Sequence, residues 1–377
     1  MRRKATPVTV AVAAVFALGI AFNAWMVAVN RADWGIDYNQ FYAASRLAGT
    51  GHLYDWPALW KLEAEHGHPG VRTGRLPVVL YGHKILGSLP YVVARSVWLA
   101  ASVAVLFFAA FWPGTRPWLM MVALAWSMPA AVGFFYGQDV SFYLMFFTAG
   151  LVLMERKKPW SAGVAFAFCI CKFHLALGIP IMLAAQKRWR TLISGGIAGL
   201  ALTASGFLIE GRGWPREFSK VFLQMREFSP APERMPNLHG IASWLPWPAA
   251  TEIVAAVAIV WLLWAVCRGG TDLGTAGAAA AACGLLVGHH GYAYDCLLLL
   301  PLAVLTMQRP GVPIWLKAWA VLLLSPVPVL LLVSQRPLPG QILIVAFTVT
   351  AILYGKAKPL SRAAGMAAGS AAAEELA

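Results

Sequence analysis

The sequence predicts an all-α fold, a polytopic bundle of helices in a membrane, and three observations support this prediction. Hydrophobic residues make up 59% of the chain and charged residues only 12%, whereas soluble domains carry about 25% charged residues. The apolar residues gather in long runs between short polar connectors. A folded chain of 377 residues has too little interior to hide this much apolar surface from water. Helices satisfy their own backbone at membrane depth, so we interpret the runs as helices.

The first element is the apolar run that follows the basic start Met1-Arg2-Arg3-Lys4. A secretory signal has a similar charge pattern. However, the uncharged run from Val8 to Val29 is long enough to cross a bilayer, and no clear cleavage site of small residues follows it. We therefore expect a first transmembrane helix with its N-terminus in the cytoplasm.

The remaining apolar runs differ in length, and several are shorter than the roughly 20 residues that a perpendicular span needs. They cover 76–90, 91–111, 118–136, 140–154, 160–185, 191–209, 250–267, 273–288, 295–307, 313–333 and 338–354. These runs predict about 10–13 membrane elements in a single domain over residues 1–360. The Ala/Gly-rich tail, 361–377, is expected to be a disordered cytoplasmic segment.

The charges predict the orientation of these elements. Short connectors such as Glu155-Arg156-Lys157-Lys158 and Lys187-Arg188-Trp189-Arg190 are net positive, whereas the long polar stretches at about 30–75 and 210–249 are close to balanced. The positive-inside rule places the connectors in the cytoplasm and the two long loops outside. The net charge of +14 is thereby explained by topology, and no nucleic-acid partner is expected.

Three segments predict irregular or surface structure. Residues 160–185 lie between two positive connectors but are too few for two full spans. Either a pair of short helices enters and leaves the membrane from the same side, with Lys172 and His174 at its apex, or the segment is a single long helix and one of the two positive connectors does not lie in the cytoplasm. Residues 76–90 predict a partial or re-entrant element. In the first loop, Tyr38–Leu47 and Trp56–Glu65 have helical apolar spacing and predict helices lying flat on the membrane surface.

Polar residues at the edges of apolar runs are the candidate functional groups, because charge at membrane depth is costly and usually marks a substrate path. On the predicted topology five such groups face outward and favour one site at the outer leaflet. They are Asp37, Gly137-Gln138-Asp139, Lys172-Phe173-His174, Asn237-Leu238-His239-Gly240 and the stretch from Gly288 to Asp295.

These residue types suit group transfer from an activated substrate. A carboxylate can accept a proton from an attacking hydroxyl, and Lys172, Arg31 and the paired histidines suit a leaving phosphate. The sequence has no ATP-type motif, so the substrate itself must carry the energy. The five cysteines lack the spacing of a zinc site or a disulfide framework and are interpreted as packed small hydrophobes. No metal or cofactor is indicated, although a divalent metal is compatible with this chemistry.

Each signal also has a purely structural alternative. Asp37 can cap the helix that starts at Tyr38, Lys172 can snorkel to the interface, and Gln138 and Asp139 can form a turn. His289 and His290 can be an interfacial hydrogen-bonding pair, and His239 alone can be structural. Their joint placement on one side of the membrane favours the functional interpretation.

An ordered set of short motifs resembles a known family. Asp37-Tyr38-Asn39-Gln40-Phe41-Tyr42 with Leu53-Tyr54-Asp55, then Gly137-Gln138-Asp139, Ala162-Gly163 with Lys172, Met235-Pro236-Asn237 and His289 to Asp295 resemble the polyprenol-phosphate-mannose-dependent alpha-(1→2)-mannosyltransferases, glycosyltransferase family 87. These are C-type membrane glycosyltransferases. Two motifs depart from the family pattern: its Tyr-Pro-Pro is Leu76-Pro77-Val78 here, and its Lys-Pro is Lys172-Phe173.

The resemblance implies an inverting transfer of a sugar, mannose by family expectation, from a polyprenyl-phosphate donor to a glycolipid or polysaccharide hydroxyl. It assigns the catalytic base to Asp37. The expected substrate-binding residues are Arg31, Tyr38, Tyr42, Gln138, Asp139, Lys172, His174, Asn237, His239, His289, His290, Tyr294 and Asp295. The expected location is the inner (plasma) membrane, with the site facing the periplasm or exterior and membrane lipid around the helices.

Two other functions remain as alternatives. A transporter or flippase of lipid-linked sugars also needs many helices and intramembrane charge, but it predicts broken helices in two repeated halves, which the sequence lacks. A noncatalytic scaffold leaves the polar groups on one side unexplained.

Overall fold

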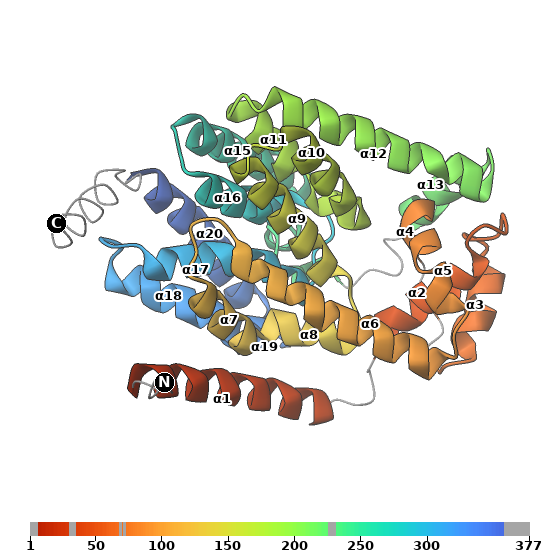
Figure 1. Ribbon diagram of the computed structural model, residues 1–377, viewed down its shortest axis with the longest axis horizontal. Coiled ribbons are helices and arrows are strands. Elements are labelled where there is room, and N and C mark those ends of the chain that lie inside the picture. Colours follow the sequence, from red (N-terminus) through yellow and green to blue (C-terminus); the bar gives the residue numbers. More distant parts are fainter. Residues whose placement is uncertain (1–6, 30–34, 68–69, 71–72, 225–230, 358–377) are drawn as a thin grey trace, which may run out of the picture.

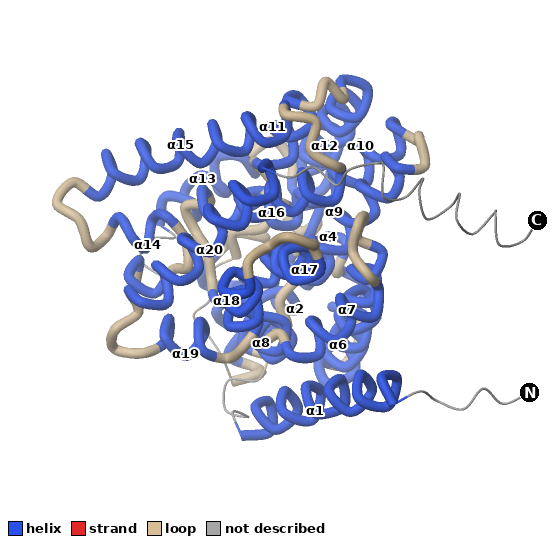
Figure 2. Tube along the Cα trace, turned by 90° about the vertical axis from the view of Figure 1, so that its left-hand side faces the viewer, coloured by secondary structure: helices blue, strands red, loops and turns tan. Residues whose placement is uncertain are grey.

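The computed structural model describes residues 7–29, 35–67, 70, 73–224 and 231–357, and every regular element among them is a helix. Figure 1 shows a bundle edged by α1 on one side and α12 on the other, and Figure 2 shows the same helices turned by 90°. The all-α prediction is therefore confirmed. The tail at 361–377 and Arg31 lie outside the described residues.

The first long loop and the segment 76–90 that follows it form a helical unit, the first-loop unit, at one end of the molecule, at the right of Figure 1. It follows α1 (Pro7–Val29) and contains α2 (Ile36–Leu47), α3 (Trp56–Ala64), α4 (Pro77–Gly82) and α5 (Lys84–Gly87). Helices form within a few residues of both predicted ranges. However, residues 38–45 of α2 are all buried, so α2 is not the half-exposed surface helix that the spacing predicted, whereas α3 buries only Leu59 and Glu63. The short α4 and α5 occupy the segment predicted to be irregular.

The remaining elements form the bundle. From 91 to 185 they are α6 (Tyr91–Leu106), η2 (Phe107–Phe111), α7 (Pro117–Trp126), α8 (Met128–Tyr136), α9 (Val140–Glu155), α10 (Pro159–Ala167), η3 (Phe168–Leu175) and α11 (Gly178–Ala185). Next come α12 (Trp189–Glu210), α13 (Trp214–Gln224), η5 (Pro232–Arg234), α14 (Leu238–Ala242) and α15 (Pro248–Arg268). The chain continues with α16 (Leu273–Val287), η6 (Ala293–Leu299), α17 (Leu300–Gln308), α18 (Ile314–Leu324), α19 (Val327–Val333) and α20 (Leu338–Ala357).

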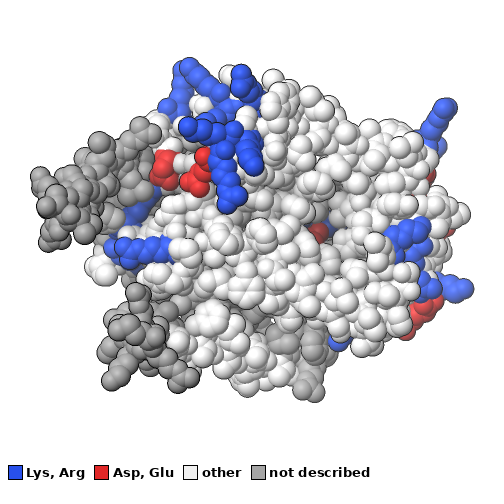
Figure 3. All heavy atoms as spheres, viewed as in Figure 1, with Lys and Arg blue, Asp and Glu red and all other residues white. Residues whose placement is uncertain are grey.

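Several of these helices are long and apolar enough to cross a membrane. Within the described part of the chain, four qualify alone, and two bent pairs, α7 with α8 and α18 with α19, qualify together. Five further apolar helices are shorter. Figure 3 shows a face whose broad middle is almost wholly uncharged, with Lys and Arg gathered toward its two ends. This distribution is that of a multi-pass membrane protein.

The segment 160–185 adopts the first of its two predicted alternatives. Two short helices, α10 and α11, flank η3, and Lys172 breaks the helical path with φ −130° and ψ 62°. Such a break is tolerated at membrane depth where it is enclosed by protein. The break places Lys172 and His174 between the two helices, so the pair rather than one long helix is correct.

The core lies around α16, which is apolar on all sides and almost completely buried. Its small residues allow very close packing: a Cβ at Gly284 would lie 1.9 Å from the carbonyl oxygen of Leu175. The helix therefore supports the η3 segment that carries Lys172. All five cysteines, each within the described part of the chain, are buried and unpaired, which fits their interpretation as packed hydrophobes.

Candidate active site

Lys172 is the centre of a buried group of charges contributed by three separate segments. Its Nζ lies 3.0 Å from Asp295 Oδ1 and 3.5 Å from Asp139 Oδ1, and the residue is only 1% exposed. A buried cation is tolerated when carboxylates balance it. Lys172 therefore does not snorkel to the interface, and that alternative is wrong.

The surrounding backbone fixes these partners. Asp295 lies in the first turn of η6, where its Oδ2 accepts a hydrogen bond of 3.0 Å from the Tyr292 backbone N–H. Tyr294, on the same turn, places its ring 5.0 Å from Lys172 Nζ in a cation–π contact. Asp139 directly precedes α9. The motif ending in Tyr-Asp thus supplies both an anion and an aromatic face to one lysine.

Arg75 is a second cation of this group, and the sequence analysis did not select it. Its Nη2 donates to Asp139 Oδ1 at 2.8 Å and to Gln138 Oε1 at 3.4 Å. Its Nε is buried and has no hydrogen-bond partner among the described residues. In the sequence Arg75 is one of several charges in a balanced loop, and only its position directly before the apolar run at 76–90 distinguishes it.

Asp37 lies beside this group, in the first turn of α2 and outside the candidate membrane spans. Desolvation raises the pKa of its carboxyl to about 6, against the lowering effects of a hydrogen bond to Gln138 and of the charges of Lys172 and Arg75. The N-cap of α2 is Gly35, so the interpretation of Asp37 as that cap is wrong. Gln138 and Asp139 do occupy a junction between helices, but their side chains also bind Asp37 and Arg75.

Tyr38 and Tyr42 belong to the packing of the first-loop unit. Tyr38 is fully buried, with its ring 6.0 Å from those of Tyr91 and Trp98. The hydroxyl of Tyr42 donates to the Leu89 carbonyl oxygen at 2.7 Å. Both residues hold α2 in place, and the structure does not bring them into the charged group around Lys172.

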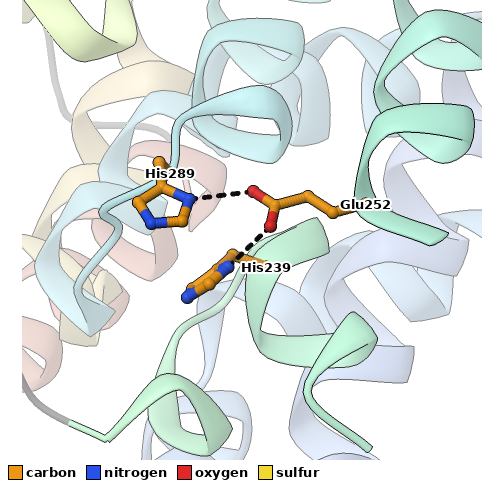
Figure 4. A group of neighbouring side chains, drawn as sticks. All are labelled: His239, Glu252 and His289. Carbon is orange, nitrogen blue, oxygen red and sulfur yellow. Dashed lines mark hydrogen bonds and ion pairs between the residues drawn. The ribbon is translucent and has the colours of Figure 1, made fainter. Parts of the chain in front are cut away.

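The histidines form a second group, drawn in Figure 4. His239 on α14 and His289 after α16 each place Nδ1 against a different oxygen of Glu252, at 2.7 and 3.0 Å. Glu252, on α15, was not predicted, because a single carboxylate near the start of an apolar helix gives no sign of its partners. These three residues are the described group that could hold a metal ion.

The other predicted polar residues connect or support the two groups. His174 lies close enough to Lys172, Arg75 and His290 to interact electrostatically with all three side chains. Burial, together with the charges of His289 and His239, lowers the pKa of His290 to about 4. Asn237 caps α14 by accepting from the Gly240 N–H, and it donates to the Gly288 carbonyl oxygen at 2.6 Å. Asn237 therefore anchors the loop that carries His289 and His290.

A cavity of about 290 Å³ opens beside the charged group. Its walls are apolar side chains of α4, α6, α9 and η3, including Trp98 and Phe142, whose rings stack 4.6 Å apart. Asp139 is its acidic lining residue. The cavity thus combines an apolar interior with one carboxylate, and the cations bound to that carboxylate, Arg75 and Lys172, are not part of its lining.

The comparisons with known proteins give one match. The model of glycosyltransferase family 87 matches residues 77–289, more than half of the chain. The match includes Asp139, Lys172, Glu252 and the two histidines bonded to it, whereas Asp37, Arg75 and Asp295 lie outside it. No curated protein and no solved structure shows a significant match.

Proposed function

The chain belongs to glycosyltransferase family 87, and from this premise we propose that it transfers mannose from a polyprenyl-phosphate donor to a hydroxyl of a glycolipid or polysaccharide acceptor. The transfer inverts the anomeric carbon and takes place at the outer face of the membrane. The observation that carries this proposal is the Asp37 carboxyl, whose pKa is raised to about 6 beside two buried cations.

Asp37 is the general base of the proposed reaction. A carboxylate with a pKa of about 6 is largely ionised at neutral pH, yet it accepts a proton more readily than an ordinary aspartate. The acceptor oxygen forms a bond to the anomeric carbon as the bond from that carbon to the phosphate oxygen breaks. The acceptor proton passes to Asp37, and the lipid phosphate leaves with the bonding electrons.

The two buried cations stabilise the negative charge on the leaving phosphate. Lys172 already shares its charge with Asp139 and Asp295, so Arg75, with its unbonded Nε among the described residues, is the better direct contact. Proton transfer to Asp37 also removes one negative charge from the neighbourhood of the phosphate. Fixed charges of this kind favour the transition state over the ground state.

The apolar cavity beside Asp139 accommodates the first isoprene units of the donor. Its volume of about 290 Å³ is small compared with a long polyprenyl chain, so the remainder of the chain lies between helices or in the lipid. Burial of isoprene units contributes roughly 25 cal/mol per Å² of apolar surface. Arg75, which is bonded to Asp139 at the edge of this cavity, then holds the phosphate within reach of Asp37.

The decisive experiment compares wild type with Asp37→Asn in liposomes that contain radiolabelled polyprenyl-phosphate mannose and membrane lipids. We expect the variant to lose about 10²- to 10⁴-fold in transfer rate, the usual contribution of a general base. Asp55→Asn is the matched control, because Asp55 lies in the same loop and its side chain caps α3 and contacts the exposed His52, away from the charged group. It should transfer mannose at nearly the wild-type rate.

Near-normal transfer by Asp37→Asn would exclude Asp37 as the base. Movement of the intact donor across the bilayer, without cleavage of the sugar–phosphate bond, would instead identify a flippase. If wild type transfers a sugar other than mannose from the polyprenyl phosphate, the proposed reaction stands and only the identity of the donor sugar changes.

A further inference from the structure

The second polar group contains the three side chains that a transition-metal site needs. His239, Glu252 and His289 come from three segments that are separate in sequence, and one potential ligand atom from each lies within 4.8 Å of the others. The ring centroids of the two histidines are only 3.9 Å apart. Figure 4 shows both imidazoles directed at the same carboxylate.

We infer that His239, Glu252 and His289 bind one Zn²⁺-type divalent cation through two imidazole nitrogens and a carboxylate oxygen. Two imidazoles with one carboxylate are a ligand set of zinc sites that keep an open fourth position. Mg²⁺ and Ca²⁺ prefer oxygen ligands, so this set selects against them. The inference goes beyond the proposed sugar transfer and does not depend on the identity of the donor.

The distances among the three side chains are close to those of a zinc site. Each Nδ1 lies 2.7 or 3.0 Å from a carboxylate oxygen of Glu252, whereas ligand atoms around tetrahedral zinc, with bonds of ~2.1 Å, lie ~3.4 Å apart. The two contacts must therefore lengthen by about 0.7 and 0.4 Å. The His289 side chain is 61% exposed and can move by that amount.

The position of the site predicts two effects of a bound ion. It would join α15 to α14 and to the loop after α16, two segments that the hydrogen bond from Asn237 to the Gly288 carbonyl oxygen already connects. Because His289 is exposed, the open fourth position can be reached from solvent by water or by an anionic oxygen. The ion would thus stabilise this end of the fold and add a positive charge near His290 and His174.

The test is a calorimetric titration with ZnCl₂ of full-length protein in detergent, after removal of the purification tag and of bound metals by a chelator. Wild type should bind one ion per chain with micromolar or tighter affinity, and its thermal unfolding midpoint should rise when zinc is added. Glu252→Gln keeps the shape and one acceptor oxygen of the side chain. We expect it to weaken binding at least tenfold, and His289→Ala to do the same.

His52→Ala is the matched control, because His52 is an exposed histidine with a single carboxylate neighbour, Asp55, at 3.6 Å. It should bind zinc like wild type. Absence of binding in wild type would overturn the inference. Equal binding by wild type, Glu252→Gln and His289→Ala would also overturn it, since that result means an adventitious ion only. Gel filtration of each variant confirms that a loss of binding is not a loss of folding.

Discussion

Removal of the Lys172 side chain should lower the stability of the fold far more than removal of a surface lysine. Lys172→Met keeps the length of the side chain but leaves Asp139 and Asp295 buried without their shared cation. We expect a loss of about 3–5 kcal/mol in the free energy of unfolding, the usual cost of breaking a buried ion pair. Thermal unfolding in detergent, followed by tryptophan fluorescence, measures the change.

Lys220→Met is the control for this prediction. Lys220 pairs with Glu217, but both side chains are about half exposed, and such pairs contribute only about 0–1 kcal/mol. Equal shifts of the unfolding midpoint in the two variants would contradict the charge balance assigned to Lys172.

The pKa of Asp37 predicts the pH dependence of the reaction. Because burial raises the pKa of this carboxyl from its ordinary value of 3.8 to about 6, the transfer rate should fall as the pH drops through about 6. The hydrogen bond from Gln138 lowers this pKa, so Gln138→Leu should move the acidic limb to higher pH. Transfer rates measured between about pH 5 and pH 8 test both statements.

The raised pKa of Asp37 also predicts a pH dependence of stability, and its direction is opposite to that of the transfer rate. A carboxyl whose pKa is raised in the folded state binds more protons when folded, so its contribution to stability decreases as the pH rises from about 4 to about 6. Asp37→Asn should therefore be at least as stable as wild type at neutral pH. A large loss of stability in this variant would contradict a raised pKa and indicate a structural role.

The limits of sequence reasoning are clearest for single residues. Lys172 and Asp295 could be selected because charge beside apolar runs is costly. Arg75 and Glu252 could not, because their significance depends on partners 64 and 37 residues away. Tyr38 and Tyr42 share a motif with Asp37, but helical periodicity directs them into the packing of α2.

At the scale of elements, the contact between α16 and η3 controls the position of Lys172. A Cβ at Gly284 would lie 1.9 Å from the Leu175 carbonyl oxygen, so Gly284→Ala must displace the η3 backbone. We expect this variant to lower both the unfolding midpoint and the transfer rate. In Gly196→Ala, on α12, the added methyl would meet no described atom within 4 Å, so neither quantity should fall. Equal behaviour of the two variants would contradict the packing argument.

The elements themselves were largely predictable. Apolar spacing located α2 and α3 as helices, because helical periodicity depends on local sequence. It did not show that residues 38–45 of α2 are all buried, since this depends on packing against distant parts of the chain. The break at Lys172 between α10 and α11 followed from the conflict between charge bias and length. The exact course of α4 and α5 could not be predicted, since short helices depend on tertiary contacts such as the packing of Leu80.

At the scale of the whole molecule, α12 separates two chemically different ends. Its 22 residues span about 33 Å at 1.5 Å per residue, which matches a bilayer core. Of the basic connector, Arg188 directly precedes α12 and Arg190 lies in its first turn. At its other end the Glu210 carboxylate accepts hydrogen bonds from the Gly49 and Gly51 backbone N–H groups of the first-loop unit. The charged connector and the unit that carries Asp37 therefore lie at opposite ends of one span (Figure 1).

This arrangement makes the sidedness of the candidate site testable with two single substitutions. All native cysteines are buried, so a new exposed thiol dominates the reaction with a membrane-impermeant maleimide. We expect Arg212→Cys, two residues beyond Glu210, to be labelled in intact cells, and Arg190→Cys to be labelled only after permeabilisation, because the positive-inside rule places the basic connector in the cytoplasm. The reverse pattern would place Asp37 and Lys172 on the cytoplasmic side, where the donor and acceptor would have to be sought instead.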